Sequence, residues 1–129
     1  MEIQFFSDPD KRPRTREDVR IKQVGIFVHD DGRKFTYGLE LTPFIERPCI
    51  DVEITNADGQ PAGALSVIET MAPNFSLVLH LRDDARSDPY WVRTILYYTT
   101  PESGPTKVDD QTVSFASVEA GEHLFSFEV

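Results

Sequence analysis

The sequence lacks most of the features that assign a chain quickly to a class. It has one cysteine, Cys49, which excludes an internal disulfide and fits a reducing, cytoplasmic compartment. No run approaches the ~18 apolar residues of a membrane span, and the first residues lack the basic and long apolar parts of a signal peptide. No window of a dozen residues shows a helical apolar stripe. We therefore expect a soluble chain with almost no helix.

Cations are also scarce. Thirteen Lys and Arg oppose 22 Asp and Glu, which gives a formal net charge of −9. This balance argues against non-specific nucleic-acid binding, which needs clustered cations, and against unaided binding to an anionic membrane. With 129 residues, 40% of them hydrophobic, the chain has the size and apolar content of one domain spanning residues 1–129.

Motifs of common catalytic sites are missing. The chain has no Gly-x-Ser-x-Gly elbow, no Walker-type or Gly-x-Gly-x-x-Gly loop, and no His-Glu-x-x-His. The spacing of His29, His80 and His123 does not indicate a metal site, so we expect them at the surface or rim. Cys49, at the start of a strand, is expected to be a buried, inert thiol. We assign no catalytic residue and do not expect an enzyme.

Alternation with period two is the strongest feature that the sequence does have. Apolar residues alternate with polar ones over residues 34–41, 50–55, 75–82 and 125–129, which is typical of strands with one buried face. Eight or nine such short runs predict an all-β fold. We favour an antiparallel two-sheet β-sandwich of about eight strands, immunoglobulin-like or C2-like, with a small closed barrel as the alternative.

Turn residues and prolines divide these runs. All nine prolines are expected between strands, and Asp30–Gly32 is expected to form a tight hairpin with Gly32 at positive φ. A bulge near Gln23 or Gly25 would reconcile the two registers of residues 19–28. Residues 7–18 are polar and are expected to form a mobile loop that connects an edge strand, with the short run Ile3–Phe5 as its candidate, to the main body.

Acidic residues gather at the expected strand ends. Loop carboxylates that converge at one end of a sandwich can bind calcium, and Asp83, Asp84 and Asp88 are the candidate ligands. The alternative is that these residues serve as turn formers and solvated charges, because no Asp-x-Asp-x-Asp-Gly calcium loop is present.

A stretch that includes Asp88 resembles part of a known family. Ser87-Asp88-Pro89-Tyr90, followed by the run Trp91–Leu96, is similar to the Ser-Asp-Pro-Tyr stretch that opens a strand in C2 domains, and Phe125–Val129 is similar to another of their strands. The resemblance implies an eight-stranded sandwich that binds calcium and phospholipid, with Asp88 as a calcium ligand and Asp83 or Asp84 beside it. It is confined to residues 75–129, and the family has the tetrapeptide near its start, so we do not assign the chain to it.

One run is apolar on both faces. Over residues 90–99, Tyr90 and Val92 point to one side, while Trp91 and Tyr97 point to the other together with Arg93. Either a loop or residues 7–18 cover the second face, or that face binds a partner. Because Trp, Tyr and Arg are enriched at binding hot spots, Trp91, Arg93 and Tyr97 are the predicted partner-binding residues.

These observations favour a non-catalytic β-sandwich module for protein association that binds a protein partner or forms a homodimer and needs no cofactor. The alternative is a calcium-dependent C2-like module that binds a membrane or another ligand. Two further hypotheses stay open: a sugar-binding sandwich with Trp91 and Tyr97 as stacking platforms, and an enzyme that uses the histidines and carboxylates.

Overall fold

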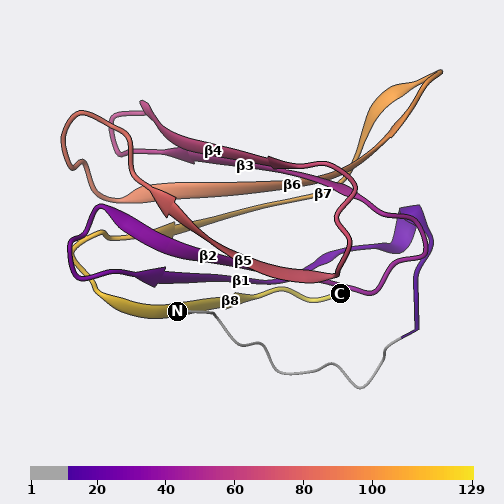
Figure 1. Ribbon diagram of the computed structural model, residues 1–129, viewed down its shortest axis with the longest axis horizontal. Helices are drawn as coiled ribbons and strands as arrows, with labels where there is room; N and C mark the ends of the chain where they lie inside the picture. Colours follow the sequence, from indigo (N-terminus) through magenta and orange to yellow (C-terminus); the bar gives the residue numbers. More distant parts are fainter. Residues whose placement is uncertain (1–11) are drawn as a thin grey trace.

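The computed structural model describes residues 12–129, which form two four-stranded antiparallel sheets packed face to face (Figure 1). The all-β sandwich of eight strands is therefore confirmed. Helical structure among these residues is limited to one turn of 3₁₀ helix, η1 (Arg16–Asp18). The first sheet contains β1 (Ile21–Val28), β2 (Lys34–Leu41), β5 (Asn74–His80) and β8 (Gly121–Ser126). The second contains β3 (Cys49–Thr55), β4 (Pro61–Val67), β6 (Tyr90–Thr100) and β7 (Gly104–Phe115).

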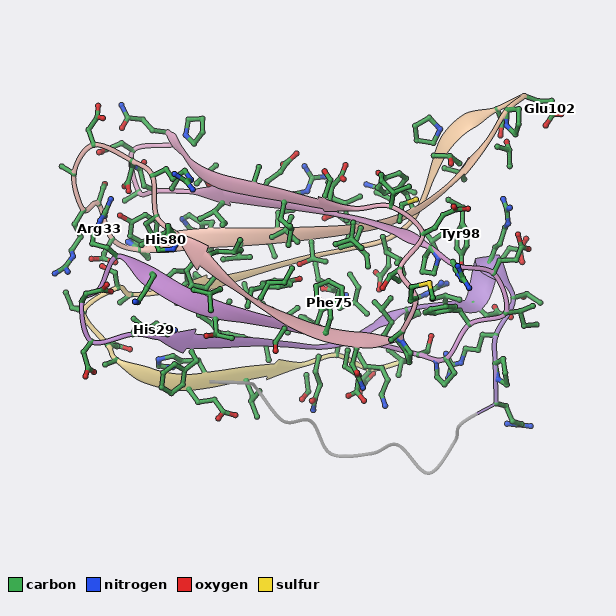
Figure 2. The ribbon with its side chains drawn as sticks, viewed as in Figure 1. His29, Arg33, Phe75, His80, Tyr98 and Glu102 are labelled. Atoms are coloured by element: carbon green, nitrogen blue, oxygen red, sulfur yellow. The ribbon has the colours of Figure 1, made fainter. Side chains whose placement is uncertain are left out.

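The chain passes repeatedly between the two layers. The strand orders are β5-β2-β1-β8 and β4-β3-β6-β7, so β1–β2, β3–β4 and β6–β7 are hairpins within a sheet, and the chain changes sheet after β2, β4, β5 and β7. β1 and β2 are central in one sheet, and β3 and β6 are central in the other. In Figure 2, Glu102 marks the tip of the β6–β7 hairpin, which extends beyond the body of the sandwich.

The core lies between the sheets and is built from the alternating residues. Inward-facing aliphatic side chains of β1, β2, β3 and β6 are almost fully buried, as the period-two pattern predicts. Tyr37 and Tyr90 are the largest of the fully buried side chains. The Tyr37 hydroxyl lies 2.6 Å from Thr94 Oγ1 in the opposite sheet, which satisfies a polar group that would otherwise be costly to bury. Burial raises the pKa of Tyr37, because the phenolate would be far from water.

Local irregularities follow the turn residues. The β1–β2 pairing shifts register between Ile21 and Gln23, which confirms the bulge expected there. Gly32 has a φ of 65°, which confirms the expected positive-φ turn. The prediction that all prolines lie between strands is wrong at two positions. Pro61 begins β4, and Pro105 is the second residue of β7. Both strands lie at sheet edges, which is where proline is tolerated within a sheet.

The segment before β1 is only partly described, because Ile3–Phe5 and the first part of the expected loop at 7–18 lie outside the described residues. Its described part contacts the end of the sandwich. The Arg14 N–H donates to the Pro43 carbonyl at 3.0 Å, and Arg16 Nη2 lies 2.6 Å from Glu46 Oε2. No helix among residues 12–129 is long and apolar enough to cross a membrane.

Candidate functional site

The outward face of β6 carries a row of four side chains, Trp91, Arg93, Ile95 and Tyr97, which we call the β6 outer row. Val92, Thr94 and Leu96 between them are at most 1% exposed and face the core. Trp91 is 46% exposed, and the Arg93 side chain is 45% exposed. The predicted division of this strand into a core face and an outer face is therefore confirmed, and partner binding by Trp91, Arg93 and Tyr97 stays a prediction.

Trp91 projects because its cross-strand neighbours are short. β6 pairs with β3 on one side and β7 on the other, which sets Trp91 opposite Thr55 and Ser114. Neither neighbour has a side chain long enough to cover an indole. Residues 12–18 do not cover it either, because Arg16 lies over the Tyr98 ring, 4.9 Å from its centroid. A large apolar group is thus exposed in a central strand, where exposure is not explained by position at a sheet edge.

Arg93 is held in place by acidic groups on both neighbouring strands. Its Nε and Nη2 donate to the two carboxylate oxygens of Asp110 at 3.0 and 2.6 Å, and Glu53 lies 3.9 Å from Nη1. Lys107 Nζ also donates to Asp110, at 3.2 Å. The hydrogen bonds from Arg93 are the main reason that the pKa of Asp110 is lowered to about 2. This bidentate pair fixes the guanidinium beside Trp91.

Tyr97 is fixed in a similar way. Its hydroxyl donates to Asp51 Oδ1 at 3.2 Å, and Ser66 Oγ donates to the same oxygen at 2.9 Å. Partial burial, followed by the nearby charge of Asp51, raises the pKa of Tyr97. The hydroxyl therefore stays protonated near neutral pH. The β6 outer row consists of pre-positioned side chains suited to contact and hydrogen bonding.

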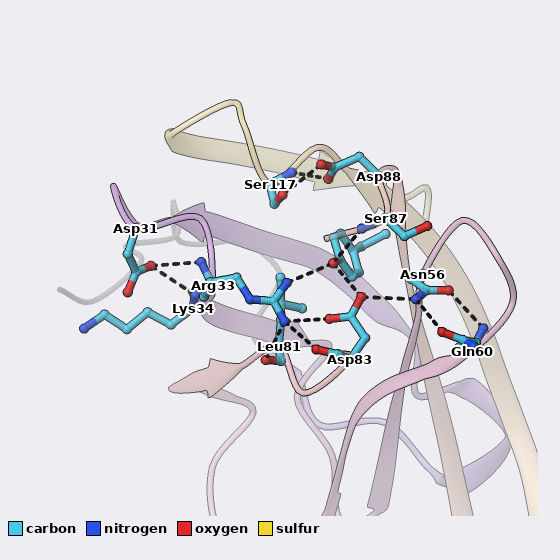
Figure 3. A network of polar contacts seen from close by, with 11 residues as sticks. Asp31, Arg33, Lys34, Asn56, Gln60, Leu81, Asp83, Ser87, Asp88 and Ser117 are labelled. Atoms are coloured by element: carbon cyan, nitrogen blue, oxygen red, sulfur yellow. Dashed lines mark hydrogen bonds and ion pairs between the residues drawn. The ribbon is translucent and has the colours of Figure 1, made fainter. Parts of the chain in front are cut away.

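The predicted calcium ligands lie at one end of the sandwich, where Asp83 belongs to a polar network (Figure 3). The Asp83 side chain is 1% exposed, and Arg33 Nη2 donates to its Oδ1 at 2.8 Å. Tyr90 and Asn56 donate to its Oδ2 at 2.7 and 3.1 Å. Burial by itself would raise the pKa of Asp83, but the three hydrogen bonds outweigh burial and lower it. Both carboxylate oxygens are thus bonded within the chain.

Asp88 and Asp84 have different surroundings. Asp88 accepts hydrogen bonds from the backbone N–H and the hydroxyl of Ser117, at 2.5 and 2.9 Å, and Asp84 is exposed. Within residues 12–129, no three His, Cys, Asp or Glu side chains are grouped so as to hold a metal ion. Calcium binding by these residues stays a prediction, and thermal unfolding in calcium and in chelator at matched ionic strength is its direct test.

The histidines and the cysteine also have defined places. His29 Nε2 lies 2.9 Å from Thr36 Oγ1, His80 is exposed at the end of β5, and His123 Nε2 lies 3.1 Å from the Glu119 carbonyl. The cysteine is buried and free, as expected. Sequence reasoning missed Arg33, the partner of the buried Asp83, because 50 residues separate the two and no local signal links them.

No family model matches the chain, and no curated protein matches it in sequence. Among solved structures, it is similar to β-glucuronidase from Ruminococcus gnavus in complex with D-glucaro-1,5-lactone, with a TM-score of 0.43 and 13% identity over 78% of this chain and 16% of that chain. A second structure of the β-glucuronidase from the same organism, in complex with uronic isofagomine, matches with the same values.

Proposed function

We propose that this chain is a non-catalytic β-sandwich module for protein association, and that the β6 outer row is its contact surface. The observation that carries the proposal is the 46% exposure of Trp91 on a central strand, between neighbours too short to cover it. Trp, Tyr and Arg are the side chains most enriched at binding hot spots, and all three are present in this row.

The contacts around the row support this function energetically. Asp110 and Glu53 hold Arg93, and Asp51 holds Tyr97, so these long side chains have already lost much of their freedom before a partner binds. Ordering a flexible side chain at an interface costs about 0.5–1.5 kcal/mol. A surface that is ordered beforehand avoids part of this cost.

Charges at the surface indicate the chemistry of the partner. Ionised side chains on or beside the row are Asp51, Glu53, Arg93, Lys107 and Asp110. The acidic groups outnumber the basic ones, and the whole chain has a net charge of −9. We therefore infer a protein partner with an apolar centre that receives the indole and a basic rim that faces the carboxylates. Added salt should slow its association.

Site-specific photo-crosslinking in cells of the source organism tests the proposal. Trp91 is replaced by p-benzoylphenylalanine in one variant, and Leu124 in a control variant; Leu124 is 42% exposed but lies on β8 of the other sheet. We expect adducts of discrete mass from position 91 and none from position 124. An adduct with twice the mass of the chain would identify a second copy as the partner. No adduct from position 91, or the same adducts from both positions, would overturn the proposal.

A further inference from the structure

Ile68 is a second exposed apolar group on the outer face of the second sheet. It directly follows β4, and its side chain is 67% exposed. Two residues earlier, the Ser66 hydroxyl donates to Asp51 Oδ1 at 2.9 Å, the oxygen that also accepts from Tyr97 of the β6 outer row. Since side chains alternate along a strand, Ile68 emerges on the same face as Ser66. The outer face therefore has exposed apolar groups at both ends, Ile68 at one and Trp91 at the other.

The chain turns sharply after Ile68, which keeps this side chain at the rim of the sheet. Glu69 has a φ of 51°, in the left-handed region that non-glycine residues rarely adopt. Thr70 then returns to the interior, where it is 6% exposed and its N–H donates to the Pro48 carbonyl at 2.9 Å. Strained conformations of this kind are maintained by surrounding contacts and are frequent at functional sites. Ile68 is thus held between a paired strand and a fixed turn.

The diagonal from Trp91 to Ile68 crosses β3, which lies between β6 and β4 (Figure 1). Trp91 and Tyr97 are six residues apart on β6, which corresponds to roughly 20 Å. Two strand spacings add a sideways step of roughly 10 Å, so the two apolar groups are roughly 22 Å apart. The outward side chains of β3 along this diagonal are Glu53 and Asp51. A partner that reaches both apolar groups must therefore pass over two carboxylates.

The backbone of this face is already paired, which restricts the kind of element that can lie on it. β3 and β6 are hydrogen-bonded to strands on both sides, and Arg82 contacts part of the edge of β4, because its N–H donates to the Ala62 carbonyl at 2.8 Å. An extended segment lying across this face would bury backbone groups without partners, whereas a helix bonds its backbone internally. Within residues 12–129 this chain has only the three helical residues of η1, so a second copy does not supply the helix.

We propose that the partner of the β6 outer row is an amphipathic helix that crosses β6, β3 and β4 diagonally, from Trp91 to Ile68. The inference rests on the proposed function and names the element that this surface binds. At 1.5 Å per residue, the diagonal corresponds to about 14 residues, and residues about seven and 14 apart lie on nearly the same face of a helix. The helix therefore has apolar residues about 14 positions apart, with a Lys or Arg about midway between them.

Glu53 is available to the basic residue at the middle of the helix. Its side chain is 57% exposed, and its contact with Arg93 Nη1 is 3.9 Å, longer than a hydrogen bond. Asp51, the second carboxylate on the diagonal, already accepts hydrogen bonds from Ser66 and Tyr97. The net charge of −9 favours a basic over an acidic helix in the same way. The central charge would fix the register of the helix between the two apolar contacts.

Photo-crosslinking from both ends of the diagonal tests the inference. In cells of the source organism, p-benzoylphenylalanine replaces Trp91 in one variant and Ile68 in another, and mass spectrometry maps the partner residue in each adduct. We expect the same partner from both positions, crosslinked within one segment at residues about 14 apart. Leu124, on β8 of the other sheet, is the control position and should give no adduct with that partner.

The outcomes separate this inference from the proposed function. No adduct from position 91 would overturn both. Adducts from position 91 together with none, or with a different partner, from position 68 would overturn the inference alone. Crosslinked residues about seven apart, the spacing of an extended segment, would also overturn it. Crosslinks to two separate segments, or an adduct with twice the mass of the chain, would do the same.

A synthetic peptide of the crosslinked segment provides a quantitative test. Since η1 is the one helical turn within residues 12–129, a gain in helical circular dichroism on mixing reports helix formed by the peptide. We expect Ile68→Asp to raise the peptide Kd at least about 10-fold by calorimetry. Ile45→Asp is the matched control, because Ile45 is 65% exposed on the connection from β2 to β3, and it should leave the Kd unchanged. Binding without a gain in helix, or equal Kd values for the two variants, would contradict the inference.

Discussion

Two arginine–aspartate pairs of similar length differ in how deeply the carboxylate is buried. Arg33 and Asp83 approach to 2.8 Å at the end of the sandwich, with side chains 35% and 1% exposed. Arg93 and Asp110 approach to 2.6 Å on the outer face of β6 and β7, with side chains 45% and 23% exposed. The bond lengths alone would rank the two pairs as equals. Their burial gives them different effects on stability and function.

The pair with the buried carboxylate, Arg33 and Asp83, stabilises the arrangement of loops. Asp83 accepts hydrogen bonds from three elements. The donors are Arg33 at the end of the β1–β2 turn, Asn56 in the turn after β3, and Tyr90 at the start of β6. Removing one member would leave desolvated polar groups without partners, which is costly. The exposed pair keeps most of its hydration in either state, so its contribution to stability is small. Its main effect is to orient Arg93 beside Trp91.

The largest expected effect on stability comes from Asp83→Asn. The substitution keeps the shape of the side chain but removes the charge and places an amide donor among other donors. We expect the free energy of unfolding to fall by about 3 kcal/mol, measured by urea denaturation. The exposed neighbour Asp84 offers a matched control. Asp84→Asn should change the free energy of unfolding by no more than about 0.5 kcal/mol. Equal losses in Asp83→Asn and Asp84→Asn would mean that the hydrogen bonds of Asp83 add nothing to stability.

The loss of stability at low pH should depend on salt differently for the two pairs. The folded pKa of Asp83 is lowered, and that of Asp110 is lowered to about 2. A depressed pKa stabilises the fold above the unfolded value of about 4, and this contribution is lost as pH falls through the folded value. We expect stability to fall from about pH 4 downward, measured by urea denaturation at successive pH values. High salt should reduce the Asp110 share more than the Asp83 share. If Asp83→Asn and the wild type lost the same stability on acidification in high salt, Asp83 would not be the source of the loss and this assignment would be wrong.

The smallest expected effect is that of Asp110→Asn. The pair is exposed, so we expect a loss of less than about 1 kcal/mol in the free energy of unfolding. In about 1 M salt the difference from wild type should become smaller, because the Debye length falls to about 3 Å. Urea denaturation at low and high salt measures both values. A loss comparable to that of Asp83→Asn would mean that exposure does not distinguish the two pairs.

The sequence was sufficient to predict features that depend on near neighbours. Period two located β2, β3 and β5, Gly32 marked a turn, and the change of register within residues 19–28 indicated a bulge near Gln23 or Gly25. The run at 125–129 did not locate β8, which ends at Ser126. The same alternation placed Trp91 on the face of its strand opposite the core, and left open whether a loop covers it. Such features need only local geometry, which a single sequence contains.

Features that depend on sheet order could not be predicted. The contact between Arg33 and Asp83 joins two connections that meet only after both sheets have formed. Without that contact, Asp83 had the features of a solvated loop carboxylate and was predicted as a metal ligand. The edge positions of β4 and β7, which explain Pro61 and Pro105 within strands, likewise require the order of the strands.

The most direct test of the proposed association surface combines binding and stability in one variant. For Trp91→Ala, we expect the Kd for the crosslinked partner to rise at least about 30-fold, as truncation of a hot-spot residue does. The free energy of unfolding should change by less than about 1 kcal/mol, because Trp91 is 46% exposed and outside the core. Calorimetry and urea denaturation on the same preparation give both values. An unchanged Kd, or a loss of stability as large as the loss of binding, would contradict the account.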